Sequence, residues 1–109
     1  MTGKKFRAAF VAMAPDADPA LHRTGIETSI YQLTSVLVKD EDEGVQVCRD
    51  LAKKKGVRSF LLCPGFTNQG VGKVADAVGS KVAVNVSRGD GPSSALGRKY
   101  LKEAGFPDR

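Results

Sequence analysis

The sequence has no tryptophan, a single histidine and only two cysteines in 109 residues. The cysteines, Cys48 and Cys63, lack CxxC spacing and fall in a predicted helix and a predicted buried strand, so neither a disulfide framework nor a metal site is expected. No run approaches the ~20 apolar residues of a membrane helix, and the basic residues 1–7 lack the apolar segment of a secretory signal. We therefore expect a cytoplasmic protein without cofactor, metal ion or membrane partner.

Aromatic residues are also scarce, at 6% of the chain, although 17 basic residues against 12 acidic ones give a formal net charge of +5. Base-stacking surfaces need aromatic side chains within a basic strand, and the sequence has no such pair. The main charge runs fit one helix, because acids at 40–43 open it and lysines at 53–55 close it. The basic character thus predicts a solvated surface and no nucleic-acid partner.

Four segments have the composition of β-strands. They are residues 6–14 (FRAAFVAMA), 30–38 (IYQLTSVLV), 57–63 (VRSFLLC) and 82–86 (VAVNV). The third becomes continuously apolar, which predicts burial on both faces at its far end. Between the first two strands, Asp18 followed by Pro19 favours one helical turn over residues 19–23, broken by Gly25.

Three segments have the period of amphipathic helices. The first runs from Asp42 to the residue before Gly56 and carries the apolar stripe Gly44, Val47, Cys48, Leu51 and Ala52. The second follows Thr67 or Asn68 as N-cap and ends at Gly79. The third has Pro92 in its first turn and ends before Gly105, leaving a tail over residues 106–109.

These elements predict one α/β domain over residues 1–109, with a four-stranded, mostly parallel sheet in the order β-β-α-β-α-β-α. Helices between the second, third and fourth strands indicate right-handed crossovers and helices packed on the faces of the sheet. The first strand fits either direction, and its apolar character favours the parallel one.

Two glycine-rich loops precede the second and third helices, where free backbone N–H groups attract anions. The polar and glycine residues that they offer are Gly65, Thr67, Asn68, Arg88, Gly89, Gly91, Ser93 and Ser94. Neither loop completes a nucleotide motif, because Val71 stands where a P-loop has lysine and the second loop lacks the third glycine of the dinucleotide motif. The loops predict binding of a small anionic molecule, with plain turns and caps as the alternative.

Three residues are candidates for catalysis: His22, Cys63 and Asp90. A thiol beside a helix start is acidified, which favours Cys63 as a nucleophile, although a small buried apolar role is the alternative. His22 reaches the loops only if the first strand is parallel, and otherwise is a surface residue. Asp90 is either a proton-transfer group or the ion-pair partner of Arg88.

The segments FRAAFVAMAPDAD (6–18), LCPGFT (62–67) and RGDGPSS (88–94) resemble, in this order, a family of small bacterial proteins of unknown function. The resemblance covers nearly the whole chain. It implies a bacterial origin and one compact domain, and it carries over no catalytic residue, because no activity is established for that family.

Three functions follow as hypotheses. The first is a binding or sensory module for a small anionic metabolite. The second is a small cofactor-independent isomerase, lyase or cyclase that uses His22, Cys63 or Asp90. The third is a structural subunit whose exposed sheet edges pair, and a homo-oligomer is compatible with all three.

Overall fold

The computed structural model describes residues 4–107 and contains a five-stranded sheet in the order β2-β3-β1-β4-β5. Its strands are β1 (Phe6–Met13), β2 (Arg23–Glu27), β3 (Tyr31–Val38), β4 (Ser59–Leu62) and β5 (Ala83–Val86). β1 lies parallel to both β3 and β4, and β4 lies parallel to β5. The predicted mostly parallel sheet and the parallel direction of the first strand are confirmed. The ends of the predicted tail and of the basic N-terminus lie outside the described residues.

The sheet has one strand more than the four predicted. β2 pairs antiparallel with β3, and all five of its residues are exposed. Its sequence, RTGIE, contains a glycine and two charges and so has no buried stripe for a pattern to detect. The predicted helical turn before it is present, since the Asp18 carbonyl accepts hydrogen bonds from Leu21 N and His22 N. The turn is shorter than predicted, because Arg23 already belongs to the strand.

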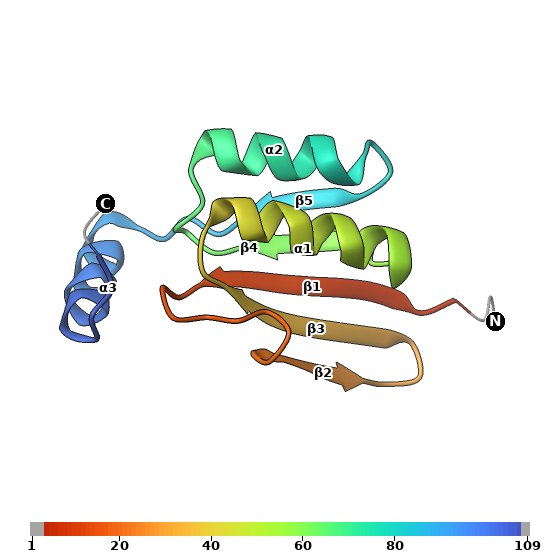
Figure 1. Ribbon diagram of the computed structural model, residues 1–109, viewed down its shortest axis with the longest axis horizontal. Helices are drawn as coiled ribbons and strands as arrows, with labels where there is room; N and C mark the ends of the chain where they lie inside the picture. Colours follow the sequence, from red (N-terminus) through yellow and green to blue (C-terminus); the bar gives the residue numbers. More distant parts are fainter. Residues whose placement is uncertain (1–3, 108–109) are drawn as a thin grey trace.

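Two helices cover one face of the sheet. α1 (Glu41–Lys54) connects β3 to β4, α2 (Asn68–Val78) connects β4 to β5, and both lie on the same side (Figure 1). Asp40 caps α1 by accepting a hydrogen bond from Glu43 N, with acids in the first turn and lysines in the last. The predicted N-cap Thr67 and C-cap Gly79 of α2 are confirmed.

The core lies between this face and the two helices. The predicted stripe of α1 is buried in full, and it meets the alternate residues of the strands that point toward it. The buried strand residues include Ala9, Val11, Val36, Val38, Phe60 and Leu62. Each large apolar side chain buried here contributes roughly 1.5–3 kcal/mol to folding.

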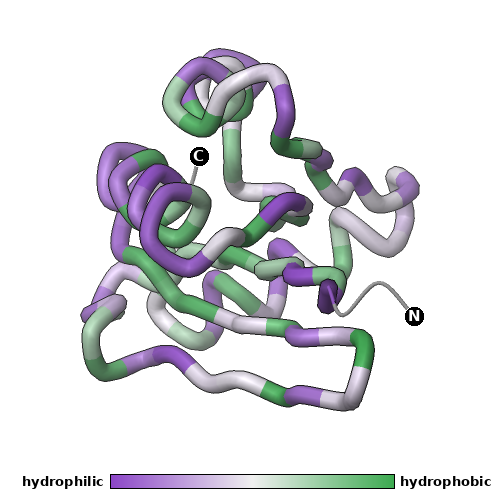
Figure 2. The backbone as a smooth tube through the Cα atoms, turned by 90° about the vertical axis from the view of Figure 1, so that its right-hand side faces the viewer, coloured by the Kyte–Doolittle hydropathy of each residue, from purple (hydrophilic) through white to green (hydrophobic). Residues whose placement is uncertain are grey.

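The third helix does not pack on the sheet as predicted. α3 (Gly91–Glu103) stands beyond the carboxyl ends of the strands, and none of its residues is buried (Figure 1). Among the described residues, no helix lies over the opposite sheet face, and Figure 2, viewed along the strands, shows the helical coils to one side. Leu61 on that face is 43% exposed, so the predicted burial of the third strand on both faces is wrong.

The topology brings several strand ends to one edge. β1, β3, β4 and β5 run in the same direction, so the loops that follow them share the carboxyl edge of the sheet. α3 and both glycine-rich loops lie at this edge. Within residues 4–107, every helix is too short or too polar to cross a membrane.

Candidate functional site

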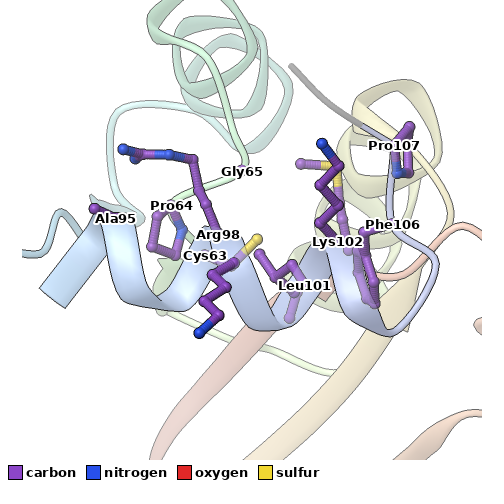
Figure 3. A pocket seen from close by; sticks show the side chains of 12 residues that line it. Cys63, Pro64, Gly65, Ala95, Arg98, Leu101, Lys102, Phe106 and Pro107 are labelled. Carbon is purple, nitrogen blue, oxygen red and sulfur yellow. The ribbon is translucent and has the colours of Figure 1, made fainter.

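A pocket of about 610 Å³ lies at the carboxyl edge, between the end of β1, the loop after β4 and α3 (Figure 3). Its lining residues are mostly apolar, and the charged ones are basic: Ala12, Met13, Cys63, Pro64, Gly65, Ala95, Arg98, Lys99, Leu101, Lys102, Phe106 and Pro107. No acidic residue is among them. A second hollow of about 480 Å³ adjoins it at Met13, Phe106 and Pro107.

The loop after β4 forms one wall of the pocket and is anchored in the core by Phe66. Phe66 is completely buried, and its amide donates a hydrogen bond to the Cys63 carbonyl. Its ring packs against Gly44 of α1, where an added Cβ would lie 2.7 Å from the Phe66 Cζ. The glycine in α1 therefore makes room for the anchor of the loop.

A carboxylate of the chain itself occupies the start of α2. Glu41, the first residue of α1, accepts hydrogen bonds from both the backbone N–H and the hydroxyl of Thr67. Thr67 Oγ1 in turn accepts a hydrogen bond from Gly70 N at 3.0 Å. A Cβ on Gly70 would lie 2.2 Å from the Glu41 carboxylate, so glycine is what allows this close approach. A carboxylate of the protein itself thus occupies the helix start at which the sequence predicted an anionic ligand.

Arg88 joins the two glycine-rich loops. Its Nη1 donates a hydrogen bond to the Pro64 carbonyl at 2.9 Å, and its Nη2 donates one to Asn68 Oδ1 at 3.3 Å. The guanidinium therefore holds the pocket wall against the connection to α3. Arg88 and Asn68 were predicted to bind ligand, and the structure gives both a role in positioning the loop.

The start of α3 is also capped by a carboxylate. Asp90 Oδ1 accepts a hydrogen bond from Ser93 N at 2.7 Å, and its carbonyl accepts one from Ser94 N. Gly89 lies against this turn, where an added Cβ would lie 2.9 Å from Ser94 Oγ. Asp90, offered by the sequence as a proton-transfer group or partner of Arg88, is the N-cap of α3. Gly91, Ser93 and Ser94 form its first turn and do not line the pocket.

The two cysteines differ in access. Cys63 is half-buried and lines the pocket, whereas Cys48 lies fully buried in the core, and neither is in a disulfide. Burial raises the pKa of the Cys48 thiol to about 12. Cys63 is therefore the thiol that a molecule in the pocket can meet.

His22 shares the carboxyl edge but not the pocket. Its carbonyl accepts a hydrogen bond from Leu37 N, and its Nδ1 accepts one from Asp18 N at 2.9 Å. β2 is three strands away from β4 in the sheet order, a lateral separation of about 14 Å at the usual strand spacing. The structure thus brings Cys63 to the pocket and leaves His22 outside direct proton-transfer reach of it.

Sequence reasoning missed the basic residues of the pocket. Arg98, Lys99 and Lys102 lie on α3, and Lys99 Nζ stands 5.7 Å from the ring centre of Tyr100. Arg98 and Lys102 are four residues apart, and Lys99 and Lys102 are three apart, so the three cations share one side of the helix. This spacing could be read from the sequence. The sequence could not show that this side faces the pocket.

Comparison with known proteins adds a family and no activity. No curated protein and no solved structure matches the chain. A family model described as "Family of unknown function (DUF6506)" matches residues 6–102, which include most of the pocket lining and nearly all of α3. With most of its length matched, the chain belongs to this family of unknown function.

Proposed function

We propose that this protein binds a small molecule that carries an anionic group on an apolar body, in the pocket between the loop after β4 and α3. The observation that carries the proposal is the composition of the pocket: apolar side chains form most of its lining, and its charged residues within the described range 4–107 are all basic. Its volume of about 610 Å³ is in the range of small-molecule sites.

The helix starts alone do not account for anion binding. Glu41 lies at the start of α2 and Asp90 caps α3, so each already has a carboxylate at its free N–H groups. A free phosphate at either position would meet a like charge. The cations of α3 remain as the groups that attract an anion into the pocket.

The lining residues divide into two roles. Arg98 is suited to hold the anionic group, because guanidinium donors form strong hydrogen bonds to carboxylate or phosphate. Met13, Leu101 and Phe106 would contact the apolar body. A ligand with an anionic group and an apolar body gains binding energy from the basic and from the apolar residues. Inorganic phosphate gains it from the basic residues alone, and a neutral alcohol from the apolar residues alone.

Thermal unfolding with four probes tests the proposal. Octanoate and phenyl phosphate combine an anion with an apolar body, inorganic phosphate lacks the body, and octanol lacks the charge. At ten times its dissociation constant a ligand adds about 1.4 kcal/mol to the free energy of unfolding, which raises Tm by roughly 5 °C in a domain of this size. We expect such shifts with one or both combined probes at concentrations where phosphate and octanol give none.

A matched pair of variants locates the site. Arg98→Ala removes a pocket cation and should weaken binding about tenfold, because one charge-assisted hydrogen bond is worth ~1.5 kcal/mol. Lys73→Ala removes a cation from α2 outside the pocket and should leave binding unchanged. Equal affinity in the two variants, or no stabilisation by either combined probe, would reject the pocket as the site.

Cys63 supports a second candidate function. Its place in the pocket lining lets Cys63 meet a bound molecule as a nucleophile, so the enzyme hypothesis now depends on Cys63 and not on His22. A cysteine-directed reagent that carries an anionic group should then modify Cys63 faster than a neutral one, and Arg98→Ala should abolish the difference. A bacterial cytoplasm, expected from the sequence, would keep this thiol reduced.

A further inference from the structure

One face of the sheet carries large apolar side chains that no other part of residues 4–107 covers. The strand register places Phe6, Ile26, Tyr31, Leu37 and Leu61 on the face opposite α1 and α2, and they are 39–67% exposed. The rings of Phe6 and Tyr31 pack edge to face at 5.1 Å. The charged strand residues, Arg7, Arg23 and Glu27, all alternate to the other side. We call this uncharged surface the open sheet face.

α3 turns the large apolar side chains of Leu96 and Tyr100 outward, with Glu103 on the same side at the end of the helix. At 100° per residue, Leu96 and Tyr100 lie on the side opposite Ala95, Arg98 and Lys102, which line the pocket. Leu96 is 53% and Tyr100 56% exposed. An amphipathic helix ordinarily buries its apolar side against its own domain, so this orientation calls for a partner. Leu101, 45% exposed, lies at the border between the two sides.

The two uncovered surfaces are matched in size, and each presents large apolar side chains. α3 has 13 residues, about 20 Å, and β1 and β3 have 8 residues each, about 26 Å, so one helix fits along the open sheet face. The five exposed sheet residues together with Leu96 and Tyr100 expose the area of about three and a half complete hydrophobic residues, roughly 500–700 Å². A stable interface of standard size takes about 800 Å² from each partner.

We propose that two copies of this chain associate about a two-fold axis, with the outward side of each α3 on the open sheet face of the other copy. Each copy offers one such helix and one such face, so a closed dimer covers both surfaces at once. Packing of the two sheets against each other would leave Leu96 and Tyr100 exposed. The basic side of α3 stays on its own pocket, and the inference therefore does not depend on the proposed ligand.

Light scattering of the full chain and three variants tests the proposal. Leu61→Glu places a charge on the open sheet face, and Tyr100→Glu places one on the outward side of α3. Leu21→Glu is the matched control, because Leu21 is 75% exposed in the turn before β2 and belongs to neither surface. We expect a dimer for the wild type and the control. Either of the other two variants should raise the dissociation constant roughly 100-fold or more, with unchanged circular dichroism.

Disulfide formation between variants identifies the contact. In a Cys63→Ser background, chains with Leu61→Cys are mixed with chains carrying Tyr100→Cys, and oxidation should join the two kinds of chain. A monomeric wild type would overturn the proposal. A 61–61 disulfide with no loss of dimer in Tyr100→Glu would overturn it in favour of face-to-face sheets. A disulfide formed only within a single chain carrying both cysteines would show that α3 folds back onto its own sheet.

Discussion

The effect of Gly70→Ala on the free energy of unfolding should change sign when the Glu41 side chain is removed. In the wild type, the new Cβ would lie 2.2 Å from the Glu41 carboxylate. That carboxylate is the end of a flexible side chain, so it would swing away and lose its hydrogen bonds to Thr67. In Glu41→Ala the carboxylate that crowds the new Cβ is gone, and alanine replaces glycine in the first turn of α2.

The magnitude follows from two opposing contributions. A hydrogen bond to a charged acceptor contributes about 1.5–3 kcal/mol. Because this site is partly exposed to water, we take about 2 kcal/mol for the two bonds that Thr67 donates to Glu41 together. Alanine stabilises a helix over glycine by up to about 1 kcal/mol. We therefore expect Gly70→Ala to cost about 1 kcal/mol in the wild type and to gain up to about 1 kcal/mol in Glu41→Ala, a coupling of about 2 kcal/mol.

Urea unfolding of the four proteins measures this coupling. Far-ultraviolet circular dichroism is the suitable signal, because the chain has no tryptophan, and one protein concentration must be used throughout. The same sign and size of effect in both backgrounds would refute the conclusion that Glu41 occupies the start of α2.

Three further predictions concern the core, the buried thiol and the start of α2. Gly44→Ala should cost about 1–3 kcal/mol by urea unfolding, because its Cβ would lie 2.7 Å from Phe66. Gly72→Ala, with open space around its Cβ inside α2, should instead gain up to about 1 kcal/mol. The buried Cys48 thiol keeps its proton up to a pKa of about 12, while the unfolded thiol loses its proton near 9.0, so stability should fall as pH rises between these values. Relative to Cys48→Ala, the wild type should lose up to about 2 kcal/mol between pH 9 and pH ~10.5, and a parallel pH dependence would contradict this. Glu41→Ala should gain thermal stability from sulfate over chloride at matched ionic strength, and a gain of the same size in the wild type would argue against an occupied helix start.

Periodicity alone was sufficient to predict most of the fold. The apolar stripe of α1 and the β-branched runs of β1 and β3 reflect burial against one core, and burial is what a hydrophobic pattern records. The caps of α2 were predictable for the same kind of local reason, since a hydroxyl before a helix and a glycine after it satisfy backbone groups. β2 was not predictable, because this exposed edge strand is defined by its pairing to β3 and buries nothing.

The site was predictable only in part, because its key relations are long-range. The sequence placed the glycine-rich loops at the carboxyl edge, and it placed Cys63 and Gly65 where the pocket wall now lies. It could not show that Glu41, 26 residues before Thr67, reaches the start of α2. Nor could it show that α3 turns its basic side toward the loop and its apolar side outward, because a helical pattern does not specify which side meets the protein.

Alkylation of Cys63 by iodoacetamide tests the proposed pocket most directly. Cys48 is buried and its thiol has a raised pKa, so it should not react in the native protein. The rate of alkylation of the native protein therefore reports on Cys63. With octanoate or phenyl phosphate at ten times its dissociation constant from thermal unfolding, the rate at Cys63 should fall about tenfold, and the same concentration of acetate should not change it. An unchanged rate under a stabilising probe would show that the ligand binds elsewhere and would contradict the account.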